Sequence, residues 1–98
     1  MKTQYKNNRI KRVCTEIGEA ERTYGIRMAQ KIHQRIKEIK AVHDVETMLK
    51  YGIGRCHKLH GDRKNQYAVD LVHPYRLVFE KHGDSIQIAM IVEVVDYH

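Results

Sequence analysis

The sequence predicts a single α+β domain in which N-terminal helices pack on a twisted antiparallel β-sheet. Apolar residues recur at helical spacing up to about residue 52, and beyond it they alternate or cluster as they do in strands. Helices that precede a run of strands are typical of α+β domains. A length of 98 residues leaves room for one domain, residues 1–98, and no repeat or linker divides it.

The chain opens with a short predicted strand, residues 2–6, followed by one or two helical turns at residues 9–14. The pair Asn7-Asn8 between them is a turn or cap signal, because asparagine side chains bond readily to nearby backbone groups. A shorter helix is predicted at residues 45–50. Asp44 precedes it as an N-cap, and a glycine at position 52 is a natural stop.

The main helix is predicted over residues 16–40, with Thr15 as its N-cap. Acidic residues dominate its start and basic residues its later half, which suits the helix dipole. Gly25 interrupts it, either to allow close packing or to divide it into two helices. Its predicted apolar face contains Ile17, Ala20, Tyr24, Met28, Ala29, Ile32, Ile36 and Ile39.

Three strands are predicted at residues 66–72, 75–80 and 85–97, separated by a His-Pro turn and a Gly-Asp turn. The short connections predict an antiparallel meander. In the last strand the even positions are apolar, which predicts one buried face. That face would contain Ile86, Ile88, Met90, Val92 and Val94.

Charge is distributed unevenly along the chain. The net charge is +6, and residues 1–64 hold sixteen basic and seven acidic side chains, whereas residues 65–98 hold two and five. A basic excess concentrated in one part of a small chain favours a polyanionic partner such as nucleic acid. The alternative is an ordinary solvated helix surface.

Several protein classes do not fit the composition. No apolar run is long enough to span a membrane, and the basic N-terminal segment lacks the apolar stretch of a secretory signal. The two cysteines, Cys14 and Cys56, do not suggest a disulfide framework or a zinc cluster. We therefore expect reduced thiols, a cytoplasmic location and no membrane partner.

Residues 55–64 form a dense basic segment that predicts a phosphate-binding edge with acid–base groups beside it. Two histidines, His57 and His60, lie within it. Its cations are Arg55, Lys58, Arg63 and Lys64. Two other interpretations exist, a polar surface loop and a zinc site formed by the two histidines with nearby Cys56 and Asp62.

A second group of candidate residues, Asp96, Tyr97 and His98, stands at the end of the sequence. The period of a strand places Asp96 and His98 on one face and Tyr97 on the other. Arg76 stands near the start of the middle predicted strand. It is either a charge at the rim of the sheet or a guanidinium directed at a phosphate.

Two stretches of the sequence resemble a known family. Residues 55–80, R-C-H-K-L-H-G-D-R-K-N-Q-Y-A-V-D-L-V-H-P-Y-R-L-V-F-E, and the ending E-V-V-D-Y-H resemble the RelE/ParE superfamily of bacterial type II toxins, in particular its HigB-like branch. That branch has an H-x-L-K-G-D-R-K-G loop, a Y-R-L-x-F strand and a terminal D-Y-H. The Y-G-x-x-x-A pattern at Tyr24, Gly25 and Ala29 also fits, so the resemblance covers nearly the whole chain.

The resemblance implies ribosome-dependent cleavage of messenger RNA without a metal ion or other cofactor. The matching catalytic positions are His57, Arg76, Asp96, Tyr97 and His98. The implied partners are the ribosome, mRNA and a cognate antitoxin that contains a helix-turn-helix. The toxin itself would be bound to operator DNA only through this antitoxin. Two positions depart from the pattern, since His60 replaces a lysine and Asn65 replaces a glycine, and the first puts phosphate affinity in doubt.

The residues leave open which histidine is the base and which the acid, and they leave two alternative functions. One is a ParE-like inhibitor of DNA gyrase without RNase activity, and the other is a non-toxic basic RNA- or ribosome-binding module. His57 and the terminal D-Y-H favour RNA cleavage. A protein that only binds gyrase has no need of convergent proton-transfer groups.

Overall fold

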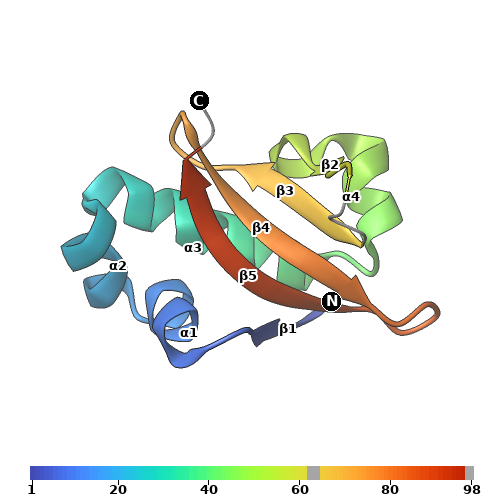
Figure 1. Ribbon diagram of the computed structural model, residues 1–98, viewed down its shortest axis with the longest axis horizontal. Coiled ribbons are helices and arrows are strands. Elements are labelled where there is room, and N and C mark those ends of the chain that lie inside the picture. The colour runs from blue at the N-terminus through green and yellow to red at the C-terminus, as the bar shows by residue number, and fades with distance from the viewer. Residues whose placement is uncertain (62–64, 97–98) are drawn as a thin grey trace.

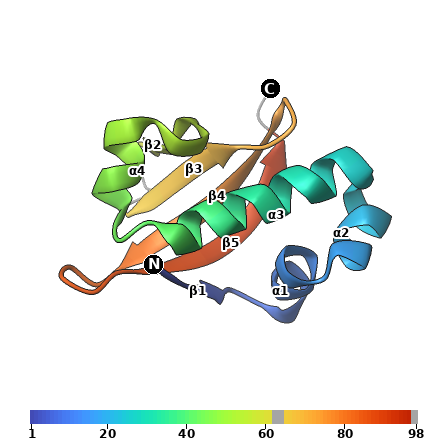
Figure 2. The same ribbon diagram turned by 180° about the vertical axis from the view of Figure 1, so that it is seen from behind.

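The computed structural model describes residues 1–61 and 65–96, which form a layer of helices on one face of a five-stranded sheet (Figures 1 and 2). The strands are β1 (Lys2–Tyr5), β2 (His57–Lys58), β3 (Gln66–Asp70), β4 (Tyr75–His82) and β5 (Ile88–Asp96). The helices are α1 (Asn8–Thr15), α2 (Ile17–Tyr24), α3 (Ile26–Ala41), α4 (Val45–Tyr51) and the short 3₁₀ turn η1 (Ile53–Arg55). The predicted α+β class is confirmed. Over the described residues, no helix has the length and apolar character needed to cross a membrane.

The sheet is mixed rather than purely antiparallel. Its order is β1-β5-β4-β3-β2, and the β2, β3, β4 and β5 pairings are antiparallel, as the meander prediction requires. β1 instead runs parallel to β5, with Lys2 opposite Ile88. A parallel pair needs a long crossover between its strands. The helices together with β2, β3 and β4 lie in the chain between β1 and β5 and form that crossover.

The predicted buried face of the last strand is wrong. Ile86 lies before β5 and is 82% exposed, whereas Ala89 and Ile91 are fully buried. The β4–β5 register moves from Phe79 opposite Ile91 to Val78 opposite Glu93 and skips Val92, which is a β-bulge. An extra residue on one strand reverses the alternation beyond it. Before the bulge, the odd-numbered residues Ala89 and Ile91 of β5 face the helices. After the bulge, the even-numbered Val94 packs on that side.

The predicted main helix is two helices, α2 and α3. Gly25 separates them with φ of 88°, a conformation that residues with a Cβ rarely adopt, so the divided alternative is the observed one. The predicted N-cap at Thr15 is wrong, because this residue ends α1 and its hydroxyl donates to the Lys11 carbonyl at 2.7 Å. Ile17 was expected in the core but is exposed. The cap at Asp44 is confirmed, since its carboxylate accepts from the Thr47 N–H at 2.8 Å.

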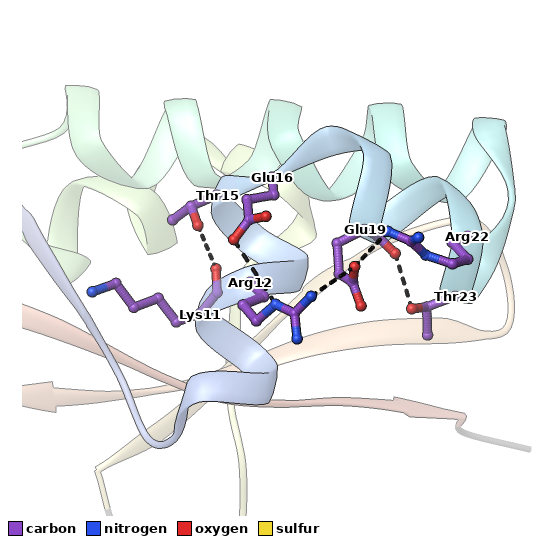
Figure 3. A network of polar contacts seen from close by, with 7 residues as sticks. All are labelled: Lys11, Arg12, Thr15, Glu16, Glu19, Arg22 and Thr23. Carbon is purple, nitrogen blue, oxygen red and sulfur yellow. Dashed lines mark hydrogen bonds and ion pairs between the residues drawn. The ribbon is translucent and has the colours of Figure 1, made fainter.

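A shared carboxylate ties α1 to α2 on the outer surface (Figure 3). Glu19 accepts from the guanidinium of Arg12 at 3.2 Å and from that of Arg22 at 2.7 Å. The hydroxyl of Thr23 donates to the Glu19 carbonyl at 2.9 Å. Both arginines are largely exposed, so each ion pair contributes only modestly to stability. The network therefore links the ends of the two short helices at the surface.

The main core lies between α3 and the sheet. The apolar stripe of α3 includes the buried residues Ile32, Ile36 and Ile39, and it packs with buried sheet residues such as Leu77 and Phe79. Figure 2 shows α3 lying across this face of the sheet. Apolar burial of this kind is the main stabilising term for a small domain. It also leaves the opposite face of the sheet without a helix layer (Figure 1).

One buried polar side chain, Gln87, joins the β4–β5 connection to the start of α4. Its side-chain oxygen accepts from the Val45 N–H at 2.9 Å, and its amide nitrogen donates to the Glu46 carboxylate at 2.8 Å and to the Asp84 carbonyl at 3.3 Å. The N–H groups at a helix start need such partners when they are buried. Gln87 therefore satisfies a group that α4 cannot satisfy itself.

We expect Gln87→Leu to lower the free energy of unfolding by roughly 1–3 kcal/mol, because it leaves the buried Val45 N–H without an acceptor. Urea denaturation measures the change. The matched control is Gln66→Leu, which removes one part-buried side-chain hydrogen bond to Glu80 and should cost clearly less. Equal costs for the two variants would contradict the role of Gln87.

Candidate functional site

The candidate site lies on the sheet face opposite α3, where β2, β3 and β4 run side by side (Figure 1). His57 is opposite Ala68 in the β2–β3 pair, Ala68 is opposite Val78, and Asp70 is opposite Arg76 in the β3–β4 pair. Directly opposed residues share a face, as do residues two positions apart on one strand. The side chains of His57, Asp70 and Arg76 therefore stand on one face.

The chain turns sharply before it presents His57. Gly52 ends α4 in the left-handed conformation, and η1 then leads to Arg55, which has φ of 54°. Cys56 is buried in the main core and anchors the segment. His57 follows as the first residue of β2. Its position is therefore set by a buried neighbour on one side and by strand pairing on the other.

The hydrogen bonds of His57 define its tautomer. Its Nδ1 lies 3.1 Å from the carbonyl oxygen of Arg55. A carbonyl can only accept, so Nδ1 carries the proton and donates. Nε2 of the neutral ring then has a lone pair, and Nη1 of Arg76 lies 3.5 Å from it. His57 therefore holds a proton acceptor next to a guanidinium.

Asp70 lies between two guanidinium groups. Its Oδ2 is 3.2 Å from Nε of Arg55, and its Oδ1 is 3.5 Å from Nε of Arg76. One carboxylate thus restrains two arginines, and the cluster keeps an excess positive charge. Arg55 is largely exposed and the other two side chains are partly exposed, so the ion pairs contribute more to orientation than to stability.

Asp96 lies at the same end of the sheet as Arg76. In the β4–β5 pair Arg76 is opposite Val95, and Asp96 is opposite Tyr75. Strand alternation directs Asp96 toward the face that Tyr75 shares and away from the face of Arg76. The structure therefore places His57 beside Arg76, whereas it directs Asp96, at the same end of the sheet, to the opposite face.

The other predicted site residues differ in their placement. Lys58 is exposed and opposite Tyr67, so strand alternation directs it away from the face of His57. His60 is exposed in the segment after β2. Four predicted residues lie outside the described residues: Arg63, Lys64, Tyr97 and His98.

A small apolar cluster supports the polar groups on this side of the sheet. Ala68, Val78 and Val92 are buried there, and the partly buried side chains of Leu59, Met90 and Val95 pack around them. Val92 lies two positions after Met90 on β5, so strand alternation places both on this face. The site therefore rests on packed strands, which hold side chains more accurately than a loop does.

The cysteines do not take part in the site chemistry. Burial raises the pKa of the Cys56 thiol, and likewise the pKa of the Cys14 thiol, from 9.0 to about 12. Both are neutral thiols near pH 7, which makes them poor nucleophiles and poor metal ligands. Within residues 1–61 and 65–96, no group of three or more His, Cys, Asp or Glu side chains is arranged to hold a metal ion.

Sequence reasoning missed Asp70. It is the one charged residue among the apolar and polar residues of β3, Gln66–Asp70. The strand period places it on the face of Ala68, and the short turn before β4 places it opposite the start of that strand, where Arg76 lies. An acid facing an arginine across a predicted hairpin is the signal that could have identified it.

Comparison with known proteins gives a match in structure. No protein-family model matches the chain, and no curated protein sequence matches it. A solved structure described as a YoeB/ParE toxin from Agrobacterium tumefaciens is similar, with a TM-score of 0.69, 18% sequence identity and coverage of 100% of both chains. At this identity the similarity is one of fold. The chain therefore has the fold of that toxin over its whole length.

The raised thiol pKa values predict a pH dependence of stability. A thiol that titrates at about 12 when folded and near 9 when unfolded contributes stability that is complete below pH 9 and is lost as the pH rises toward 12. We therefore expect the free energy of unfolding to fall between pH 9 and 10.5, and to fall less steeply in Cys14→Ala and Cys56→Ala. Urea denaturation at several pH values measures the slopes. Parallel slopes for parent and variants would contradict burial of the thiols.

Proposed function

We propose that this protein is the toxin of a type II toxin–antitoxin pair, of the HigB-like branch, and that it cleaves mRNA on the ribosome without a metal ion. The observation that carries the proposal is the contact of His57 with Arg76, 3.5 Å between Nε2 and Nη1, on the open face of a toxin-like sheet. The loop and terminal motifs of the sequence support the same reaction.

The proposed reaction uses the 2′-hydroxyl of the RNA as nucleophile. Nε2 of His57 accepts the hydroxyl proton as the 2′-oxygen bonds to phosphorus and the bond from phosphorus to the 5′-oxygen breaks. The guanidinium of Arg76 stabilises the negative charge that gathers on the phosphate oxygens. In this proposal His98 supplies the proton that the 5′-oxygen takes up. The products are a 2′,3′-cyclic phosphate and a 5′-hydroxyl.

The remaining proposed residues bind or orient. Tyr97 stacks on a base beside the scissile bond, and Asp96 orients or charge-balances a histidine. Arg55 supplies a second guanidinium to the phosphate backbone. His60, Arg63 and Lys64 extend the contact along the RNA, and Lys58 adds positive charge from the other face of β2.

The tautomer of His57 favours RNA cleavage over gyrase inhibition, the second candidate. A protein that only binds gyrase gains nothing from an imidazole lone pair held beside a guanidinium. The same pair meets the needs of 2′-hydroxyl attack, a base and a cation close together. The basic excess of residues 1–64 suits a large RNA surface such as the ribosome.

A toxin of this kind requires an inhibitor in the same cell. We propose a cognate antitoxin that binds operator DNA through a helix-turn-helix and covers the basic site with an acidic segment. Arg55 is 86% exposed and offers an accessible cation beside the site for such a segment. Recovery of the protein from native extracts bound tightly to a small acidic-tailed partner tests this point.

Induction of the protein in cells, followed by mapping of mRNA 5′ ends, tests the function. We expect new ends inside translated coding regions, and we expect His57→Gln to reduce their formation by about 10²–10⁴-fold because glutamine cannot accept a proton near neutral pH. The matched control is His82→Gln, a histidine on β4 that bonds to Glu80 at the other end of that strand. It should cleave like the parent.

Two results would reject the proposal. Intact messages together with damaged DNA would indicate gyrase inhibition. Unchanged cleavage by a folded His57→Gln variant would show that the reaction does not use His57.

A further inference from the structure

Arg35 reaches the sheet from α3 and is held by two partners. Its side chain is only 13% exposed. Its Nε donates to the backbone carbonyl of Asp70 at 2.6 Å, and its Nη1 donates to the Glu38 carboxylate at 2.8 Å. A nearly buried guanidinium with partners on two sides has little freedom to move.

The bond to the Asp70 carbonyl replaces a strand contact. β2 and β3 pair residues 57 with 68 and 58 with 67, so continuing the same register would place residue 55 opposite Asp70. Residue 55 instead belongs to η1, and the ladder begins only at His57. The arginine from the helix layer therefore binds the end of β3 where no strand partner continues.

Arg35 also contacts η1. A Cβ on Gly54 would lie 2.9 Å from Nε of Arg35 and 3.2 Å from Cβ of Val69, and Gly54 has φ of 60°. Only glycine allows the backbone to approach the guanidinium this closely. The next residue is Arg55, whose carbonyl accepts the Nδ1 proton of His57. Arg35 thus binds the end of β3 and lies close to η1, the two segments that carry the site.

We propose that Arg35 is a positioning residue that fixes Asp70 and η1, so that the Asp70 carboxylate holds Arg55 and Arg76 in place beside His57. Arg35 binds the backbone of Asp70, and the side chain of the same residue binds the two site arginines at 3.2 and 3.5 Å. The proposal rests on the proposed RNA cleavage for its catalytic consequence. Its structural part does not depend on RNA.

The experiment measures hydrogen exchange of the Nε protons of Arg76 and Arg55 by NMR in the free protein, and kcat and KM on ribosome-bound mRNA. Asp70→Asn removes the charge that both protons face, so we expect exchange at Arg76 to rise roughly tenfold to a hundredfold. Arg35→Met should also raise the exchange rate of the Arg76 Nε proton, and it should lower kcat. Arg35→Lys, which keeps the charge, should lie between Arg35→Met and the parent.

Glu38→Gln is the matched control. It removes the ion pair of Arg35 on α3 but keeps the bond from Arg35 to Asp70, so exchange at Arg76 should stay at the level of the parent. Thermal melts identify variants that do not fold. If Arg35→Met fails to fold, Arg35→Lys and Asp70→Asn decide the question.

The outcomes separate this inference from the proposed function. Folded Arg35 variants with a lowered melting temperature but parental exchange at Arg76 and parental kcat would overturn the inference, because Arg35 would then be purely structural. Faster exchange in the variants of a parent protein that cleaves no RNA would support the positioning role and reject the proposed function.

Discussion

The burial of one face of α3 against the sheet is the interaction on which the rest of the molecule depends. Ile32, Ile36 and Ile39 occupy one side of this helix, and they cover the sheet face formed by Leu77, Phe79 and neighbouring strand residues. A helix can cover only one face, so the polar residues of the middle strands remain on the other. Arg35, next to Ile36 in the sequence, brings the helix layer into contact with the end of β3.

The site itself depends on a balance of charge. Two arginines near one histidine would repel each other without Asp70, and a second carboxylate would cancel the positive charge that a phosphate needs. One carboxylate between the Nε atoms of Arg55 and Arg76 orders both and leaves a net cation. This arrangement explains how an open sheet face can keep a defined side-chain geometry without a helix layer over it.

The sequence predicted the buried residues correctly where one regular apolar period runs along an element that packs on a single core. The α3 face follows the helical period, and its buried residues were predicted. The face of β5 was not, because both of its faces carry apolar residues, with Ala89 and Ile91 on one and Met90 and Val92 on the other. The bulge at Val92 then breaks the period of two, and a bulge depends on pairing with β4. The parallel pairing of β1 joins residues more than eighty positions apart, which local patterns cannot reveal.

In the candidate site, too, some residues could be predicted from the sequence and others depend on contacts between distant segments. His57 and Arg76 were proposed as catalytic from the family resemblance, and the structure places the two side chains together. Asp70 was overlooked because its role comes from cross-strand register rather than from its neighbours in sequence. Arg35 resembled any basic residue in the later half of a helix, and its low exposure appears only when the sheet end and η1 close over it.

The most direct test of the account is cleavage of a ribosome-bound message that carries one 2′-deoxynucleotide at the mapped cleavage position. We expect the unmodified message to yield a 2′,3′-cyclic phosphate and a 5′-hydroxyl, and the 2′-deoxy message to stay intact at that position. Cleavage of the 2′-deoxy message at the same bond would contradict it, because another nucleophile would then be at work.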